Sequence, residues 1–290
     1  MTSLNPTRAT FCGLLVAGTL TLAACGDGDE PTSDAASSSW TTEATAEIDP
    51  VLLDEAVAEY DAYVEQETGD FVVATEDFLA PVEAGDVDGA KAAYPGARVH
   101  FERIEPVAGA FGDLDPDIDG REGDIPPQDW GGYHRIEKAL WIDESTEGLE
   151  KTIKELRNDV ANLNDIAIKA EFDPAEIAQG SVDLLAEVSA SKITGEEERY
   201  SHTDLWDFEA NVAGAEAGFE ALKPALEQAD PELADEIETE FAAMYELLDQ
   251  HREGDGFVLY DTLSEERTQE LAQQIDTLGE PLSQIPSLVG

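Results

Sequence analysis

The sequence predicts an all-α protein, most simply arranged as two antiparallel four-helix bundles. From about residue 48 onward Ala, Leu and Glu dominate, and apolar side chains recur at the spacing of one helix face. Alternating runs of β-branched residues, which are typical of strands, do not occur in this region. About eight helical stretches joined by mostly short connections favour a pair of bundles.

The first helix is predicted from an apolar stripe that ends at the Gly- and Asp-containing break "EAGDVDG", residues 83–89. The apolar residues of this stripe are Leu53, Val57, Tyr60, Val64, Phe71, Phe78 and Val82. A second helix is predicted at about 86–111, interrupted or kinked at Pro95 and Pro106. Residues 112–129, "GDLDPDIDGREGDIPPQD", are predicted to form a loop.

The remaining helices follow the same periodicity. One begins after the loop and contains "GGYHRIEKALW", residues 131–141. The others are predicted at about 148–170, 174–192, 204–228, 231–252 and 262–278.

The N-terminus predicts export and lipid attachment. After Arg8, the stretch "ATFCGLLVAGTLTLAA" is too short to span a bilayer comfortably and has the form of a signal-peptide core. It leads into "LAAC", which matches the lipobox of bacterial lipoprotein signals and makes Cys25 the acylated residue. An ordinary signal peptide cleaved nearby is the alternative. We expect a signal peptide at 1–24, a lipidated flexible tether at 25–47, and one helical domain at 48–290 on the extracytoplasmic side of the cell membrane, periplasmic or cell-surface.

The net charge of the chain limits the kinds of ligand that it can bind. There are 16 Lys and Arg against 66 Asp and Glu, a formal net charge of −50. Nucleic acid is excluded as a partner because phosphate binding needs a basic face. Cations are the natural ligands of such a surface, although an acidic balance can equally be an adaptation for solubility, for example in salt.

Two pairs of potential ligands stand three residues apart on predicted helices. "HRIE" contains His134 and Glu137, and "ERIE" contains Glu102 and Glu105. Helix bundles build metal sites by pointing such pairs inward, and one imidazole with several carboxylates suits iron, zinc or manganese. Glu-x-x-Glu also arises by chance in an acidic chain, and a histidine among aromatic residues is commonly a packing residue. Spacing alone therefore leaves both interpretations open.

The acidic loop resembles a calcium-binding loop only in part. Asp115, Asp117, Asp119 and Gly120 occupy positions 1, 3, 5 and 6 of an EF-hand loop, but Pro126 stands at position 12, where the bidentate Glu belongs. An EF-hand is therefore not predicted. The loop is either solvated or supplies one Asp to a metal held by the helices.

The remaining motifs and histidines do not favour a catalytic site or a second metal site. Neither a His-Glu-x-x-His nor a Gly-x-Ser-x-Gly motif occurs, so the residues do not predict a peptidase or another hydrolase. His202 and Asp204 could form a second cation site, but the neighbouring apolar residues favour packing, with Thr203 or Asp204 capping the next helix. His100 and His251 are predicted at the surface.

Three separated motifs, "ARVHFERIEPVAGAFGDLDPDID", "GGYHRIEKALW" and "EEERYSHTDLWDFEANVAGAEAGFEALKP", occur in this order. Together they resemble the imelysin-like family, and within it the EfeO and EfeM components of bacterial Efe-type iron uptake systems. The resemblance covers residues 48–290 and implies two four-helix bundles with a metal site around His-x-x-Glu. The ligands that it implies are His134, Glu137, Glu102, Glu105, Asp119 and one Glu of "GEEERYSH", either Glu197 or Glu198.

The chain differs from the long EfeO proteins, which carry a cupredoxin-like domain before the helical one. Only the short tether stands in that place, so the chain resembles the short form, and a ferroxidase role of the cupredoxin part is in doubt.

The resemblance implies a non-enzymatic lipoprotein that binds iron, as Fe(II) or Fe(III), with Zn(II) also tolerated by the donor set. It would deliver the ion to an Efe-type membrane permease, with a haem peroxidase as the usual third component. A polysaccharide-binding lipoprotein of the same fold is the alternative, and a metallopeptidase a more distant one.

Overall fold

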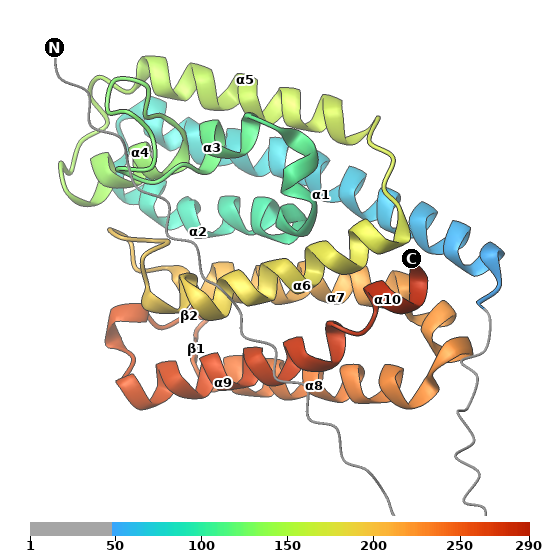
Figure 1. The fold of residues 1–290 in the computed structure, drawn as a ribbon. Helices are drawn as coiled ribbons and strands as arrows, with labels where there is room; N and C mark the ends of the chain where they lie inside the picture. Colours follow the sequence, from blue (N-terminus) through green and yellow to red (C-terminus); the bar gives the residue numbers. More distant parts are fainter. Residues whose placement is uncertain (1–47) are drawn as a thin grey trace, which may run out of the picture. The chain divides into compact units, whose positions relative to one another are not determined.

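The computed structural model describes residues 48–290, so the predicted signal peptide, Cys25 and the tether lie outside the described residues. The regular secondary structure of the described part is helical apart from one short hairpin, which confirms the predicted fold class (Figure 1). Within 48–290, no helix combines the length and apolar character that crossing a membrane would require.

Helices from the first half of this range form one bundle. They are α1 (Pro50–Ala84), α2 (Val87–Ile104), α3 (Leu114–Asp119), α4 (Gly132–Trp141) and α5 (Glu150–Ala167), with a 3-10 helix, η1 (Glu105–Phe111), after α2. Helix α1 packs against both α2 and α5, and α4 packs against α2 and α5. The short α3 covers α4 and α5.

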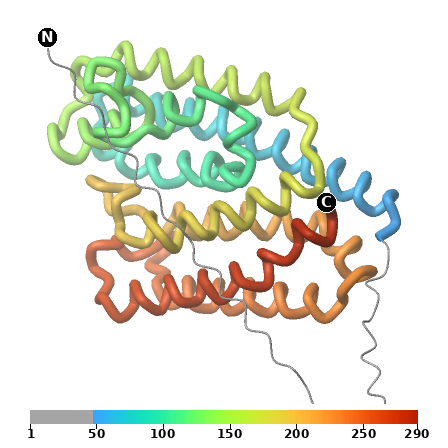
Figure 2. Tube along the Cα trace, viewed as in Figure 1, coloured from blue at the N-terminus to red at the C-terminus, as the bar shows by residue number. Residues whose placement is uncertain are grey.

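The second half forms the other bundle. Its helices are α6 (Pro174–Ala190), α7 (Asp204–Ala229), α8 (Pro231–Asp249), α9 (Glu265–Leu282) and α10 (Pro286–Val289). Its connections contain the 3-10 helices η2 (Lys192–Thr194) and η3 (Tyr260–Thr262), and a hairpin of β1 (Arg252–Glu253) and β2 (Gly256–Phe257), antiparallel with Arg252 opposite Phe257. Figure 2 shows the two bundles as successive parts of the chain, blue to green and yellow to red.

Local sequence explains where the long helices begin and end. The Asp49 carboxylate accepts the backbone N–H of Val51 at the start of α1, and Gly85, with φ 74°, ends that helix in the left-handed conformation. Asp173 and Glu176 form a capping box at the start of α6. These signals place the helix boundaries independently of tertiary packing.

The bundles meet mainly through α7, which packs against α1 and α2. A Cβ atom at Gly214 of α7 would lie 2.3 Å from the carbonyl oxygen of Arg103 on α2. Only glycine permits this approach, so the two helices lie close enough for side chains of both bundles to share one buried cluster.

Several expectations differ from the structure in detail. Pro95 lies inside α2 without ending it, and the α-helical part of the predicted 86–111 segment ends at Ile104, just before Pro106. The predicted loop 112–129 contains α3, which buries Ile118 completely. Tertiary packing of that one apolar residue accounts for a helix in an otherwise acidic segment.

The prediction that His251 lies at the surface is wrong, since the residue is only 7% exposed. It follows α8, and the chain folds back over it through the β1–β2 hairpin, so that the Val258 N–H donates to the His251 carbonyl. His100 is partly buried, with Nδ1 2.7 Å from Oε2 of Glu67.

Candidate metal centre

A cluster of polar and charged side chains lies at the contact between the bundles. Its members come from α2, the end of α3, α4, η2, the 195–203 connection and α7. They are Arg98, Glu102, Asp119, His134, Glu137, Lys192, Glu197, Glu198, Ser201, Asp204, Asp207 and Asn211, all buried except Asp119, which is partly buried. Burying so many charges is costly unless they pair with one another or with a bound ion.

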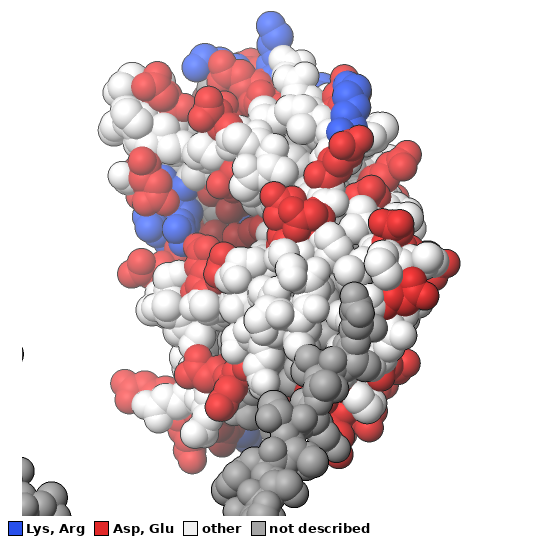
Figure 3. All heavy atoms as spheres, turned by 45° about the vertical axis from the view of Figure 1, so that its right-hand side comes forward, with Lys and Arg blue, Asp and Glu red and all other residues white. Residues whose placement is uncertain are grey.

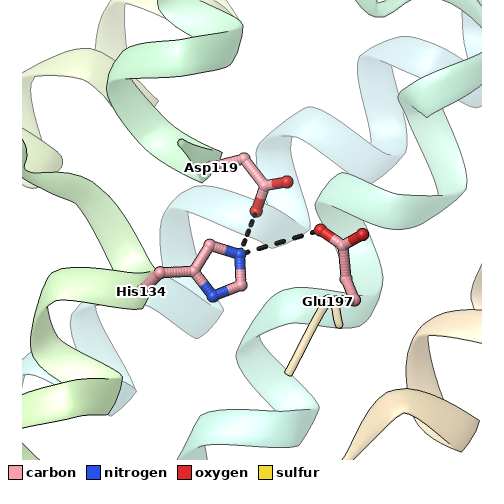
Figure 4. A group of neighbouring side chains, drawn as sticks. All are labelled: Asp119, His134 and Glu197. Atoms are coloured by element: carbon pink, nitrogen blue, oxygen red, sulfur yellow. Dashed lines mark ion pairs between the residues drawn. The ribbon is translucent and has the colours of Figure 1, made fainter. Parts of the chain in front are cut away.

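The imidazole of His134 faces two carboxylates through its Nε2 atom (Figure 4). Nε2 lies 3.4 Å from Oδ1 of Asp119 and 3.8 Å from Oε1 of Glu197. His134 is 2% exposed, and its Nε2 has no hydrogen-bond partner. A buried ring nitrogen without a partner is uncommon, and here it points at two acceptors that stand slightly too far away for good hydrogen bonds.

Glu137 lies on the other side of the ring. Its Oε2 atom is 3.1 Å from Nδ1 of His134. Its Oε1 atom accepts the backbone N–H groups of Tyr200, at 2.9 Å, and Ser201, at 2.8 Å, and the Ser201 hydroxyl at 2.9 Å. Helix α4 is therefore tied to the connection that precedes α7.

The two glutamates that the sequence leaves as alternatives belong to different sets of ligand atoms around the imidazole. Glu197 joins Asp119 at Nε2, whereas Glu198 forms a set with His134 and Glu137. Oε1 of Glu198 lies 2.6 Å from Nε of Arg98, and its Oε2 lies 2.8 Å from the Ser201 hydroxyl oxygen. Burial, with the nearby charge of Glu137, raises the pKa of Glu198 to about 8.

Glu102 and Glu105 are held by cations and an amide. Nζ of Lys192 lies 3.0 Å from Oε2 of Glu102, and the Asn211 side chain donates to the same oxygen at 3.0 Å. Asn211 also donates to Oε2 of Glu105 at 2.8 Å. Within residues 48–290, the two sets of metal-capable atoms that converge on His134 include neither Glu102 nor Glu105.

Two buried cations of the cluster were missed by the sequence reasoning. The Arg98 guanidinium pairs with Asp119, Glu102 and Glu198. Its position four residues before Glu102 on one helix could have indicated that pair. No sequence signal marks Lys192, because η2 approaches the cluster only through the tertiary fold.

For the "YSHTD" segment the sequence favoured packing over a second cation site at His202 and Asp204. The imidazole of His202 is 38% exposed, and its Nε2 lies 4.0 Å from Oδ2 of Asp261. Asp204 is buried at the first turn of α7 and accepts the Glu198 N–H at 3.2 Å. Asp207 and Asn211 extend the polar face of α7 into the cluster and were not anticipated.

The surroundings shift the pKa values of several groups in the cluster. Burial and the charge of Arg98 oppose protonation of His134, yet the nearby carboxylates of Asp119, Glu137 and Glu197 outweigh both and put its pKa well above the usual value. Burial opposes ionisation of Glu197, but Lys192 and His134 hold the pKa of that carboxyl well below its usual range. Arg98, acting against burial, likewise lowers the pKa of Asp119.

A cavity of about 340 Å³ adjoins the Nε2 side of the imidazole. Asp119 and Glu197 belong to its lining, together with Glu105, Asp115, Arg121, Asp124, Glu187 and Lys192. Acidic side chains also far outnumber basic ones on the face of the protein seen in Figure 3. Two carboxylates beside the bare ring nitrogen can therefore be approached by a cation through a largely acidic cavity.

Comparison with known proteins finds relatives over most of the chain. A family model named peptidase M75 and described as imelysin matches residues 56–285. An Efem/EfeO family lipoprotein of Staphylococcus haemolyticus is 41% identical over 280 residues, which cover 94% of this chain and 96% of the relative. One of Staphylococcus aureus strain NCTC 8325 is 42% identical over 239 residues, or 80% and 84% of the two chains.

A solved structure shares the fold. It belongs to a protein of Parabacteroides distasonis described as an iron-regulated protein A precursor. The TM-score is 0.61 at 16% identity, and the match covers 84% of this chain and 97% of the other. At this identity the likeness extends to the helical architecture alone.

Proposed function

The chain belongs to the imelysin family, and from this premise we propose that it is the metal-capturing lipoprotein of an Efe-type iron uptake system. Relatives named Efem/EfeO family lipoproteins, matched over most of the chain, support this assignment. Their name also supports a lipid-anchored protein outside the cytoplasm. The "LAAC" motif makes Cys25 the proposed acylated residue. In this role the ion is cargo, and the protein binds and releases it without chemical change.

The observation that carries the proposal is the bare Nε2 atom of His134 between Asp119 and Glu197. Two donor atoms that each bind an ion at about 2.1 Å, at a tetrahedral angle, stand about 3.4 Å apart. Nε2 lies 3.4 Å from the Asp119 oxygen and 3.8 Å from the Glu197 oxygen. The residues therefore fit a cation, which would take the position between them with little movement of the side chains.

The donor set also limits the kind of ion. One imidazole and two carboxylates favour iron, as Fe(II) or Fe(III), and tolerate Zn(II), while a soft ion would prefer thiolates. The other set is the poorer choice, because Nδ1 is already hydrogen-bonded to Glu137 whereas Nε2 has no partner, and because burial raises the pKa of Glu198 to about 8, so that this carboxyl holds a proton at neutral pH.

Neighbouring positive charges suit a carrier that must release its cargo. Arg98 pairs with Asp119, and Nη1 of Arg121 lies 3.1 Å from Oε2 of Glu197. These cations compete with the ion for both carboxylates and keep binding reversible. We propose that the ion passes to an Efe-type membrane permease, with a haem peroxidase as the third component of the system.

Calorimetric titration of the protein with iron tests the site. We expect wild type to bind one ion, and Asp119→Asn and His134→Ala to weaken binding by at least a hundredfold. His100→Ala is the matched control, because this partly buried histidine contacts Glu67 instead. Equal affinities for wild type and His134→Ala would show that the ion binds elsewhere.

A further inference from the structure

The Glu137 carboxylate already accepts four hydrogen bonds from the protein itself. A carboxylate offers about four lone-pair positions. Glu137 accepts from Nδ1 of His134, from the N–H groups of Tyr200 and Ser201, and from the Ser201 hydroxyl, which makes four donors. The residue is completely buried. Three of the four donors are directed at Oε1, so an ion at that oxygen would have to displace one of them, and Oε2 already accepts from the imidazole itself.

The contact with His134 determines which ring nitrogen is available to an ion. A carboxylate that accepts the Nδ1–H proton of an imidazole leaves the lone pair of Nε2 free for a metal and fixes the plane of the ring. Nε2 of His134 is the atom that faces Asp119 and Glu197. Glu137 therefore acts on the ion through the imidazole.

The other carboxylate oxygen of Glu137, Oε1, holds the chain segment that carries Glu197. Tyr200 and Ser201 follow Glu197 by three and four residues, in a connection without helix, and Oε1 of Glu137 holds both of their N–H groups. One carboxylate thus fixes the imidazole on α4 and the segment that carries Glu197. The distance between those two donors depends on it.

We propose that Glu137 is a positioning residue: it orients His134 and anchors the Glu197 segment, and it does not coordinate the ion. This inference rests on the proposed function. It separates the two members of the His-x-x-Glu pair, which the resemblance would treat as equal ligands.

The substitution Glu137→Gln tests the role because an amide has a single acceptor oxygen. If that oxygen accepts the Tyr200 and Ser201 N–H groups, the amide NH₂ faces Nδ1 and favours the tautomer with a proton on Nε2. If the amide oxygen instead accepts from Nδ1, the amide NH₂ faces the backbone N–H groups of Tyr200 and Ser201, so that donors face donors. Either arrangement disturbs the site without removing any of the three proposed ligands.

The experiment measures Fe(II) affinity without oxygen, and the visible spectrum of the protein saturated with Co(II), whose bands report the donor set. We expect Glu137→Gln to lose 10- to 100-fold in affinity, the range typical of residues that orient a ligand, and to keep the wild-type band positions. Asp119→Asn, which alters a ligand, should shift the bands. A band shift in Glu137→Gln, or unchanged affinity, would overturn the proposal.

A matched control and a milder variant distinguish the loss of positioning from misfolding of the protein. Glu122→Gln removes an exposed carboxylate that contacts the Tyr200 hydroxyl but not His134, and should leave affinity and spectrum unchanged. Ser201→Ala removes one of the four donors to Glu137 and should weaken binding a few-fold with unchanged bands. Wild-type affinity in Ser201→Ala would count against the anchoring role.

A readout without metal separates this inference from the proposed function. In the metal-free protein, a hydrogen-bonded Nδ1 proton of His134 should give a downfield, slowly exchanging NMR signal that Asp119→Asn keeps and Glu137→Gln loses. If wild type bound no iron but the signal behaved in this way, the proposed function would fail while the positioning role stood. A signal that persists in Glu137→Gln would refute the positioning role.

Discussion

Nζ of Lys192 lies 2.6 Å from Oε2 of Glu105, which joins η2 to η1 by an ion pair across the contact between the bundles. The same Nζ atom lies 3.0 Å from Oε2 of Glu102. Both glutamates of the "ERIE" motif thus pair with one lysine that is distant in sequence. Their place in the structure is explained by charge pairing in the interface, whether or not an ion is bound.

The first prediction concerns this lysine. Lys192→Met leaves buried carboxylates without their partner, so we expect the free energy of unfolding to fall by about 3–5 kcal/mol, measured by urea denaturation at pH 7. Lys151→Met is the control: Lys151 is 74% exposed, and its loss should cost less than about 0.5 kcal/mol. Similar small effects for both variants would contradict the structural role of Lys192.

A second prediction follows from Gly132 at the start of α4. This residue has φ 69°, and a Cβ atom there would lie 2.2 Å from the carbonyl oxygen of Ile118, the residue before Asp119. Gly132→Ala should therefore push α4 away from α3, lowering stability by about 1–3 kcal/mol and weakening iron binding. Gly131→Ala meets no atom within 4 Å and should match wild type in thermal unfolding and calorimetry. Iron affinity unchanged in Gly132→Ala would show that the separation of Asp119 and His134 does not matter.

The third prediction is the pH dependence of iron binding. The ion needs the bare Nε2 atom of His134, but surrounding carboxylates hold the pKa of this imidazole well above its usual 6.5, against burial and the charge of Arg98. Protons therefore compete with the ion through the neutral range. Below the raised pKa, affinity should fall up to tenfold for each unit of pH, and iron uptake should release protons. Titrations between pH 6 and 9 in several buffers test this, and a flat profile would exclude competition at His134.

The fourth prediction concerns the stability of the metal-free protein. The pKa of Glu198 is about 8, against a usual 4.5, mainly because the group is buried. Between these values the folded state holds a proton that the unfolded state has lost, so stability should fall as pH rises from 6 to 9. Glu198→Gln carries no such proton and should lose less stability over this range. The exposed Glu236→Gln should behave as wild type does, and urea unfolding in the presence of EDTA measures all three proteins.

Much of the fold could be predicted because helix signals are local. The stripe of α1, the break at Gly85 and the caps before α6 and α8 depend on residues within one or two turns. The helix α3 could not be predicted, since its stability depends on burying Ile118 against other elements. The end of α9 at Leu282, beyond the predicted 278, and the short α10 were missed for the same reason.

The candidate site could be predicted only in part. Helical spacing indicates that His134 and Glu137 share a face, but it cannot show that the glutamate meets Nδ1 while Nε2 meets Asp119. Nor can it show that Arg98 and Lys192 enter the cluster, because those contacts arise where separate elements pack. The assignment of Asp119 and of a Glu near 197 came from family resemblance, and the structure brings both to the imidazole.

The central claim is that one iron ion binds between His134, Asp119 and Glu197. Anomalous diffraction at the iron absorption edge, from crystals grown with iron, tests it most directly. We predict a single strong peak about 2.0–2.2 Å from Nε2 of His134, bonded also to the Asp119 and Glu197 carboxylates. A peak elsewhere, for example on Asp115 and its acidic neighbours, with none beside His134, would contradict the account.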